Sequence, residues 1–189
     1  RANSYGKNTV SQLARLYRKV IGLCRILDIN YVVAHAELNY QIDFSVEEQT
    51  EKAVLEWRRL CDEFSANKIY VNIENHAEFV PDHLIALMEK VGSPYLGMCL
   101  DIGHVNAFSS LGIQNWLRRY PLGSIREVHL ADNKADDDTH LPLGEGNIDF
   151  PGFLDTFAKR GESCTFVLEP RNIEEARKSL SFLVKSGIL

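Results

Sequence analysis

The sequence predicts a parallel α/β fold, and three observations lead to this prediction. Five short apolar segments rich in β-branched and aromatic residues alternate with longer segments whose apolar residues recur at helical spacing. No Asn-Gly or Asp-Gly hairpin turn lies between them. The short segments are largely continuous apolar runs, as expected for strands that are covered on both faces. Helices packed on a sheet of parallel strands explain all three observations.

The first helix and strand come from the N-terminal part of the chain. Asn8 or Thr9 can cap a helix, because their side-chain oxygens accept backbone N–H bonds, and its apolar residues keep helical spacing almost to Asp28. The run Ile29–Ala34 is the first expected strand, and it stops at His35.

The next units repeat this alternation. Ser45 and Glu48 form the pattern of a capping box and predict the start of the second helix. The second strand, Ile69–Ile73, stops at Glu74, and Pro81 is well suited to the first turn of a third helix.

The third and fourth strands are expected at Tyr95–Leu100 and Ser124–Leu130, with a helix at Ile113–Arg119 between them. Asp101 follows the third strand directly, and His129 lies near the end of the fourth.

The C-terminal part predicts one more strand between two helices. Phe153–Lys159 has helical spacing, and Cys164–Leu168 is the fifth strand, which ends at Glu169. The pattern Asn172-x-x-Glu175 then predicts the start of a last helix.

A side chain able to bind a metal stands at or near the C-terminal end of every expected strand. These side chains are His35, Glu74, Asp101, His129 and Glu169. In parallel α/β barrels the βα loops converge at these strand ends, and the helix N-termini there carry partial positive charge. Asn, Ser or Gly would end a strand equally well, so five metal-competent residues in five positions predict an active site.

The stretch Glu127–Phe150 adds further potential ligands after the fourth strand. An acidic loop delivers Asp138 and His140 ahead of the glycine turn Gly144-Glu145-Gly146. Mixed histidine and carboxylate ligands suit zinc, manganese or iron better than calcium. The alternative is a polar, solvated loop with a histidine nearby.

Composition limits the class of protein and its partners. The 189 residues are 45% hydrophobic and 25% charged, which predicts one globular domain over residues 1–189. The net charge of −5 makes nucleic acid an unlikely bulk partner without excluding a small basic groove. No apolar run is long enough to cross a membrane. Four widely spaced cysteines are typical of core thiols in a reducing cytoplasm, where we expect the protein to be located.

Four motifs in order along the chain carry a family resemblance. They are Val71-Asn72-Ile73-Glu74-Asn75-His76, Gly97-Met98-Cys99-Leu100-Asp101-Ile102-Gly103-His104, Val128-His129-Leu130 with Asp138-Thr139-His140 and Leu143-Gly144-Glu145-Gly146, and Phe166-Val167-Leu168-Glu169-Pro170. With them the sequence resembles the xylose isomerase-like TIM-barrel superfamily. This superfamily holds sugar and sugar-phosphate isomerases and epimerases together with AP endonucleases of the endonuclease IV type.

The resemblance implies a set of site residues. The shared metal site would consist of four strand-end residues: Glu74, Asp101, His129 and Glu169. His35 would belong to an adjacent site. His104, Asp138 and His140 resemble the ligands of a further metal in the endonuclease branch. Two alternatives remain open: His104 binds substrate, and Asp138 and His140 merely order their loop.

The chain also departs from the family pattern. The family barrel has eight strands and five are expected here. When the strand ends are matched, His35 falls on the fourth family strand, and strands one to three would lie upstream of Arg1. Five strands leave two open edges and an uncovered interior. We therefore expect a parallel (β/α) TIM barrel that lacks its first three strands in this chain, either as a fragment or closed by a partner.

The resemblance implies two activities. In the first, a divalent ion (Mn, Zn, Co or Mg) binds a small sugar or sugar phosphate. Glu74 and Glu169 then remove a proton from this sugar and return it. Lys134 and Arg171, together with His104, are expected to bind this substrate. In the second, a zinc cluster hydrolyses DNA at abasic sites. The acidic loop at residues 132–138 would repel a phosphate backbone, so the sugar isomerase or epimerase is favoured. An inactive metal-binding barrel and a homo-oligomer also remain open.

Overall fold

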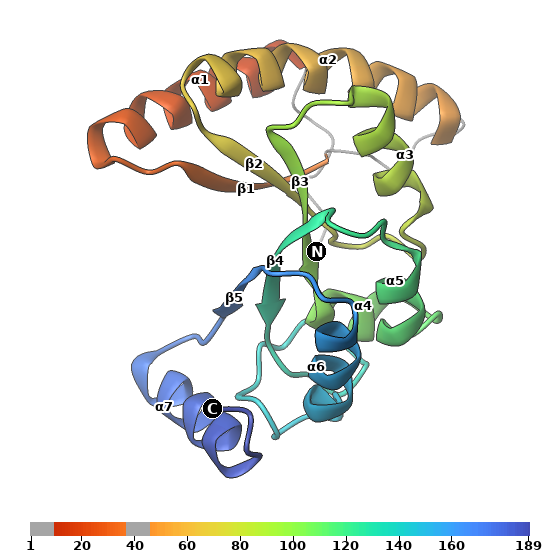
Figure 1. Ribbon diagram of the computed structural model, residues 1–189, viewed down its shortest axis with the longest axis vertical. Helices are drawn as coiled ribbons and strands as arrows, with labels where there is room; N and C mark the ends of the chain where they lie inside the picture. The colour runs from red at the N-terminus through yellow and green to blue at the C-terminus, as the bar shows by residue number, and fades with distance from the viewer. Residues whose placement is uncertain (1–9, 37–45) are drawn as a thin grey trace. The chain divides into compact units, whose positions relative to one another are not determined.

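The computed structural model describes residues 10–36 and 46–189. These residues form seven helices and five strands, which alternate except that α5 directly follows α4 (Figure 1). The strands are β1 Tyr31–His35, β2 Tyr70–Glu74, β3 Leu96–Asp101, β4 Ile125–Leu130 and β5 Thr165–Leu168. The helices are α1 Val10–Leu27, α2 Val46–Ala66, α3 Asp82–Val91, α4 Ile102–Phe108, α5 Ile113–Arg119, α6 Phe150–Lys159 and α7 Ile173–Lys185. The strands follow chain order in one sheet, which confirms the parallel α/β prediction.

The described part of the chain divides into two compact units. Of the described residues, the first unit comprises 10–36, 46–74 and 82–98, and the second comprises 75–81 and 99–189. Strand β3 contributes Leu96–Met98 to the first unit and Cys99–Asp101 to the second. The expectation of a single domain stays a prediction.

The first unit packs α1, α2 and α3 with the parallel pair β1 and β2. His35 is the register partner of Glu74 at the ends of these two strands. In Figure 1, α1 and α2 lie on the same side of β1 and β2. The buried Trp57 of α2 joins these layers, because its indole ring lies 5.7 Å from the Tyr17 ring of α1 and its Nε1 donates to the carbonyl of Ala36.

The second unit contains the strands β4 and β5 and the helices α4 to α7. The two strands are parallel, with Leu130 opposite Leu168. Trp116 and Phe150 are fully buried in the core of this unit. Arg160, at the end of α6, donates to the backbone carbonyls of Leu117 and Tyr120 and so satisfies carbonyls at the end of α5. These contacts join the end of α6 to the end of α5.

The predicted strands are all present, and no end differs by more than two residues. The sequence did not predict α4, a short helix that follows Asp101 without a loop. Its start depends on the Asp101 side chain, which accepts from the backbone N–H of His104. Helix α6 starts at Phe150, earlier than expected, because Asp149 caps it. The predicted caps Asn8, Thr9 and Ser45 lie outside the described residues.

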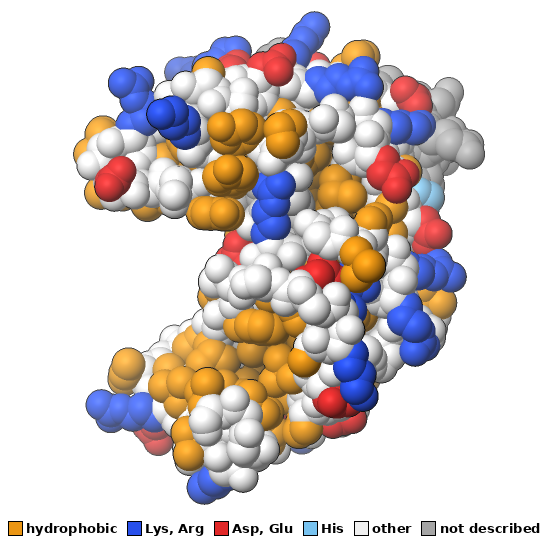
Figure 2. Space-filling model, viewed as in Figure 1, with side chains coloured by type: hydrophobic (Ala, Val, Ile, Leu, Met, Phe, Trp, Pro, Cys, Tyr) orange, Lys and Arg blue, Asp and Glu red, His pale blue; other side chains and the backbone are white. Residues whose placement is uncertain are grey.

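Exposed large hydrophobic side chains gather on the first and last elements of the described chain. In α1 and β1 they are Leu16, Leu23, Ile26, Leu27 and Tyr31; in β5 and α7 they are Phe166, Ile173, Leu180 and Val184. Figure 2 shows hydrophobic surface over β5 and α7. Such surface agrees with the open sheet edges expected from the sequence. The three further strands upstream of Arg1 stay a prediction.

None of the described helices is both long and apolar enough to span a membrane.

Candidate metal site

Asp101 is fixed by three hydrogen bonds at the point where β3 becomes α4. Its backbone N–H donates to Oδ1 of Asn75 at 2.9 Å, and its carbonyl accepts from Nδ2 of Asn75 at 2.9 Å. Its own Oδ1 accepts from the backbone N–H of His104 at 2.8 Å. The residue is 1% exposed. Oδ2 of Asp101 is therefore held facing Nδ1 of His129, 3.9 Å away.

His129 lies in β4 with a carboxylate on each side of its ring. Nε2 lies 3.3 Å from Oε1 of Glu127, and Nδ1 lies 3.1 Å from Oε1 of Glu169. Glu127 and His129 share one face of the strand because they are two residues apart. Donor atoms of Asp101, His129 and Glu169 lie within 4.8 Å of one another, so the second unit brings three of the four predicted ligands together.

The fourth predicted ligand, Glu74, ends β2 in the first unit and is buried. Its Oε2 lies 3.2 Å from Nε2 of His35, so these two predicted residues meet at the ends of neighbouring strands. Glu74 directly precedes Asn75, the residue that binds Asp101. That Glu74 shares an ion with Asp101, His129 and Glu169 stays a prediction.

A second cluster joins His104, Asp138 and His140. Nε2 of His104 lies 3.3 Å from Oδ2 of Asp138, and Nε2 of His140 lies 3.1 Å from the same oxygen. Each Nδ1 faces a backbone carbonyl, that of Asn75 for His104 at 2.8 Å and that of Glu169 for His140 at 3.2 Å. A carbonyl can only accept, so Nδ1 carries the proton in both rings. In the neutral rings, both Nε2 lone pairs then point at one carboxylate.

The pKa values of His104, Asp138 and His140 are shifted because these three side chains lie close together. Burial lowers the pKa of His104, but the hydrogen bond to Asp138, the charge of Asp101 and the Asn75 carbonyl together raise it to about 9. Burial raises the pKa of Asp138, but hydrogen bonds and charge from His104 and His140 lower it overall. The pKa of His140 is raised by Asp138 and Glu169 against the effect of burial. Without a metal, this cluster holds protons where a cation could bind.

The donor atoms of both clusters fit a divalent ion. When Nε2–H of neutral His129 donates to Glu127, the lone pair of Nδ1 faces the Glu169 carboxylate. This nitrogen and Oε1 of Glu169 are both acceptors and lie 3.1 Å apart. They repel each other unless a proton or a cation lies between them. The Nε2 lone pairs of His104 and His140 also face a carboxylate oxygen of Asp138, so a proton or a cation must lie between them as well. Mixed imidazole and carboxylate donors suit zinc or manganese. Glu127 would act on His129 as the outer carboxylate that commonly orients a metal-binding histidine.

The loop that carries Asp138 and His140 is held by one buried carboxylate. Oδ2 of Asp132 accepts from the backbone N–H groups of Gly144 and Gly146, at 2.9 and 2.8 Å. A Cβ atom at Gly146 would collide with this carboxylate and with the carbonyl of Asn133, so only glycine fits there. His140 itself has a φ of 47°, an uncommon backbone conformation for a residue other than glycine.

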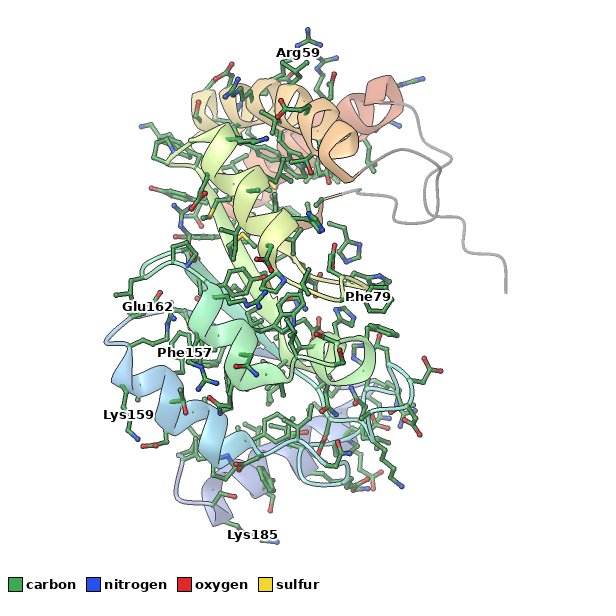
Figure 3. All side chains as sticks on the ribbon, turned by 90° about the vertical axis from the view of Figure 1, so that its right-hand side faces the viewer. Arg59, Phe79, Phe157, Lys159, Glu162 and Lys185 are labelled. Atoms are coloured by element: carbon green, nitrogen blue, oxygen red, sulfur yellow. The ribbon has the colours of Figure 1, made fainter. Side chains whose placement is uncertain are left out.

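The two predicted substrate-binding cations lie on the surface. Lys134 is exposed in the loop after β4. Arg171 is exposed, and its guanidinium donates to both carboxylate oxygens of Glu175 at 3.1 and 2.8 Å. The loop after β2 carries Phe79, whose side chain is 68% exposed (Figure 3). The carbonyl of Phe79 accepts from Oγ of Ser109, which ties this loop to the end of α4.

Three supporting residues were not predicted from the sequence. Asn75 lay inside a recognised motif, but its pairing with Asp101 joins residues distant in sequence. In the sequence Asp132 is one residue of an acidic loop, although it is fully buried in the structure. Glu127 could have been found, because a carboxylate two positions before a strand histidine lies on the same face of the strand.

Comparison with known proteins places the chain in a family. The sequence profile described as xylose isomerase-like TIM barrel matches residues 7–186. The chain belongs to this family. This result confirms the resemblance inferred from the four motifs.

The chain is also similar to individual proteins. The chain is 34% identical over 122 residues to an uncharacterised protein of Methanocaldococcus jannaschii, a match that covers 61% of this chain and 41% of that protein. A D-tagatose 3-epimerase-like protein of known structure is 25% identical, with a TM-score of 0.76 and coverage of 96% of this chain and 74% of that one. The IolI protein, solved with a bound zinc atom, is 19% identical, with a TM-score of 0.78 and coverage of 98% and 71%.

The chain spans less than half the length of the Methanocaldococcus protein that it matches.

Proposed function

We propose that the protein is a divalent-metal-dependent isomerase or epimerase of a small sugar or sugar phosphate. The observation that carries the proposal is the convergence of Asp101, His129 and Glu169 at the C-terminal ends of parallel strands. Similar solved structures include sugar epimerases and a zinc-bound protein, which supports this class of enzyme and this kind of cofactor.

The metal would be held by Glu74, Asp101, His129 and Glu169. A bound divalent ion supplies Lewis-acid polarisation of a substrate carbonyl, which makes the neighbouring C–H more acidic. Support for Glu74 as the fourth ligand comes from its place at a strand end and from its peptide bond to Asn75, which binds Asp101. His35, 3.2 Å from Glu74, would orient that carboxylate or belong to an adjacent site.

The glutamates would exchange the proton. Glu169 is 27% exposed in its side chain, compared with 2% for Asp101, so it is the ligand in the second unit that a substrate can reach. We assign removal of the substrate proton to one of Glu169 and Glu74 and its return to the other, since epimerisation needs a base on each face of the carbon. Lys134 and Arg171 are proposed to bind a phosphate or hydroxyl group, which for Arg171 requires release from Glu175.

Proton exchange with solvent tests this function. The protein, loaded with Mn²⁺ or Co²⁺, is incubated in D₂O with a panel of ketoses and ketose phosphates, and NMR follows the C–H groups next to the carbonyl. We expect deuterium at that carbon of one substrate class together with appearance of its epimer or isomer. Absence of exchange for every sugar in a metal-loaded protein would contradict the proposal.

Hydrolysis of a phosphodiester is a second candidate, and one observation favours it. His104, Asp138 and His140 direct two Nε2 atoms and a carboxylate oxygen to one point, which is a ligand set for a further ion. Several ions are useful when charge develops on a phosphate. Two observations disfavour this function, because negative charge repels a phosphate backbone. The net charge is −5, and Asp136 and Asp137 are exposed in the same loop.

A further inference from the structure

We infer that Asn75 is a positioning residue that sets the coordination geometry of Asp101 through its side-chain amide. The inference rests on the proposed metal site, and it concerns a residue that supplies no ligand of its own. Asn75 is 1% exposed and lies where the chain leaves β2, directly after Glu74.

The amide of Asn75 pairs with both backbone groups of one residue. Oδ1 accepts from the N–H of Asp101 and Nδ2 donates to its carbonyl, both at 2.9 Å. Such pairing replaces the hydrogen bonds of a neighbouring strand one residue beyond the end of β2. Asp101 can therefore remain the last residue of β3 while its side chain already caps α4.

The consequence for the site is a fixed direction of the Asp101 carboxylate. With the backbone held by Asn75 and Oδ1 held by the N–H of His104, Oδ2 lies 3.9 Å from Nδ1 of His129 and 3.5 Å from Nδ1 of His104. The carbonyl of Asn75 also accepts from Nδ1 of His104, which fixes the tautomer of that ring. One residue thus orients a ligand in each of the two clusters.

Only asparagine meets the requirement at this position. The site needs a donor and an acceptor on one short planar group. Aspartate keeps the size and the acceptor but cannot donate to the Asp101 carbonyl when ionised, and alanine loses both bonds and leaves two buried backbone groups without this partner. Outer residues that orient metal ligands commonly change metal affinity by about 10- to 100-fold.

Titration with Co²⁺ tests the inference, because its visible absorption bands report the geometry of the ligands around the ion. The titration compares the protein with Asn75→Ala, Asn75→Asp and the control Ser124→Ala. Ser124 is also buried in the second unit but bonds the carbonyl of Pro121 at the opposite end of β4 from His129. We expect Asn75→Ala to weaken Co²⁺ binding by about tenfold or more and to shift the bands, with shifted bands also in Asn75→Asp. The control should match the unsubstituted protein.

Two results would overturn the inference, and they have different meanings. If both Asn75 variants bind Co²⁺ with unchanged affinity and bands, the metal site stands and Asn75 does not position it. If the unsubstituted protein binds no Co²⁺, the proposed metal site and the inference fall together. The aspartate variant keeps the test decisive if the alanine variant does not fold, since it retains the volume and one of the two bonds.

Discussion

Oε1 of Glu127 lies 3.3 Å from Nε2 of His129, on the side of the ring opposite to Glu169. The pair occupies one face of β4 because its members are two residues apart. With its proton directed at Glu127, the imidazole presents Nδ1 to Asp101 and Glu169. Glu127 thus determines which ring nitrogen is available to a metal.

We predict that Glu127→Gln weakens divalent-metal binding by roughly 10- to 100-fold. The amide can still accept a hydrogen bond from Nε2, but it lacks the charge that increases the basicity of the imidazole. Isothermal titration with Zn²⁺ in the presence of a competing chelator measures the change. Glu145→Gln is the matched control, because Glu145 pairs with Lys178 outside both clusters. Equal affinity in the two variants would remove Glu127 from the site.

Substitution of the two glutamates should separate proton transfer from metal binding. We predict that Glu74→Gln or Glu169→Gln abolishes turnover, while metal affinity falls less than in Asp101→Ala. An amide oxygen can still approach the ion, but it cannot act as a base at neutral pH. Solvent-exchange kinetics and metal titration are measured on the same samples. Unchanged kcat in both glutamine variants would refute the acid/base assignment.

The strand-end residues could be predicted because the signal is local. A polar residue that stops an apolar run, as Asp101 and Glu169 do, is visible in a few letters of sequence. The start of α4 could not be predicted in this way. Its seven residues include a glycine and two β-branched side chains, so propensity alone does not mark a helix, and it starts at the Asp101 cap.

The supporting contacts could not be predicted for a different reason. Asn75 and Asp101 are 26 residues apart, and Asp132 holds backbone N–H groups 12 and 14 residues further along the chain. Such pairs depend on how the chain folds back, which no local pattern encodes. The sequence also does not distinguish the buried Asp132 from the exposed aspartates that follow it.

The turn held by Asp132 should be sensitive to a single methyl group. We predict that Gly146→Ala destabilises the protein by about 1–3 kcal/mol, because the new Cβ would collide with the Asp132 carboxylate and the Asn133 carbonyl. Binding at His140 should weaken as well, since the same loop carries it. Gly161→Ala is the control, as no atom lies within 4 Å of a Cβ placed there, although its φ of 68° adds some strain of its own. Urea denaturation of both variants gives the comparison, and equal loss of stability would contradict the prediction.

The metal-free protein should lose stability as the pH rises. The folded pKa of His104 is raised to about 9, above the ordinary value of 6.5. Its stabilising effect is therefore complete below about pH 6.5 and is lost as the pH rises through 9, and it amounts to something on the order of 3 kcal/mol. Asp138, with a lowered pKa, loses its contribution at the acidic end instead.

Urea denaturation in EDTA at pH 6 and pH 10 measures this effect. The difference in unfolding free energy between the protein and His104→Gln should shrink across that interval, because the glutamine does not titrate. A difference that stays constant from pH 6 to pH 10 would show that protonated His104 does not stabilise the fold. Metal addition should reverse the trend, since binding at Nε2 displaces the proton and becomes tighter as the pH rises.

The number of ions required separates the two candidate functions. If the substrate is a small sugar, one ion at Asp101, His129 and Glu169 suffices, and His140→Ala should mainly raise KM. If the substrate is DNA with an abasic site, the second cluster must hold a further ion, and the same substitution should collapse kcat. Binding to a duplex should then also weaken steeply with salt, because phosphate contacts release counterions.

We expect the first outcome, because the exposed Asp136 and Asp137 lie in the loop that a phosphate backbone would have to approach. Metal analysis of the loaded protein, with His140→Ala beside it, is followed by incubation of both with a ketose panel and with an abasic-site duplex. Cleavage of the duplex that requires His140 and more than one ion per chain would select the second candidate. That result would leave the ligand positions of Asp101, His129 and Glu169 unchanged, since both chemistries use an ion at the ends of these strands.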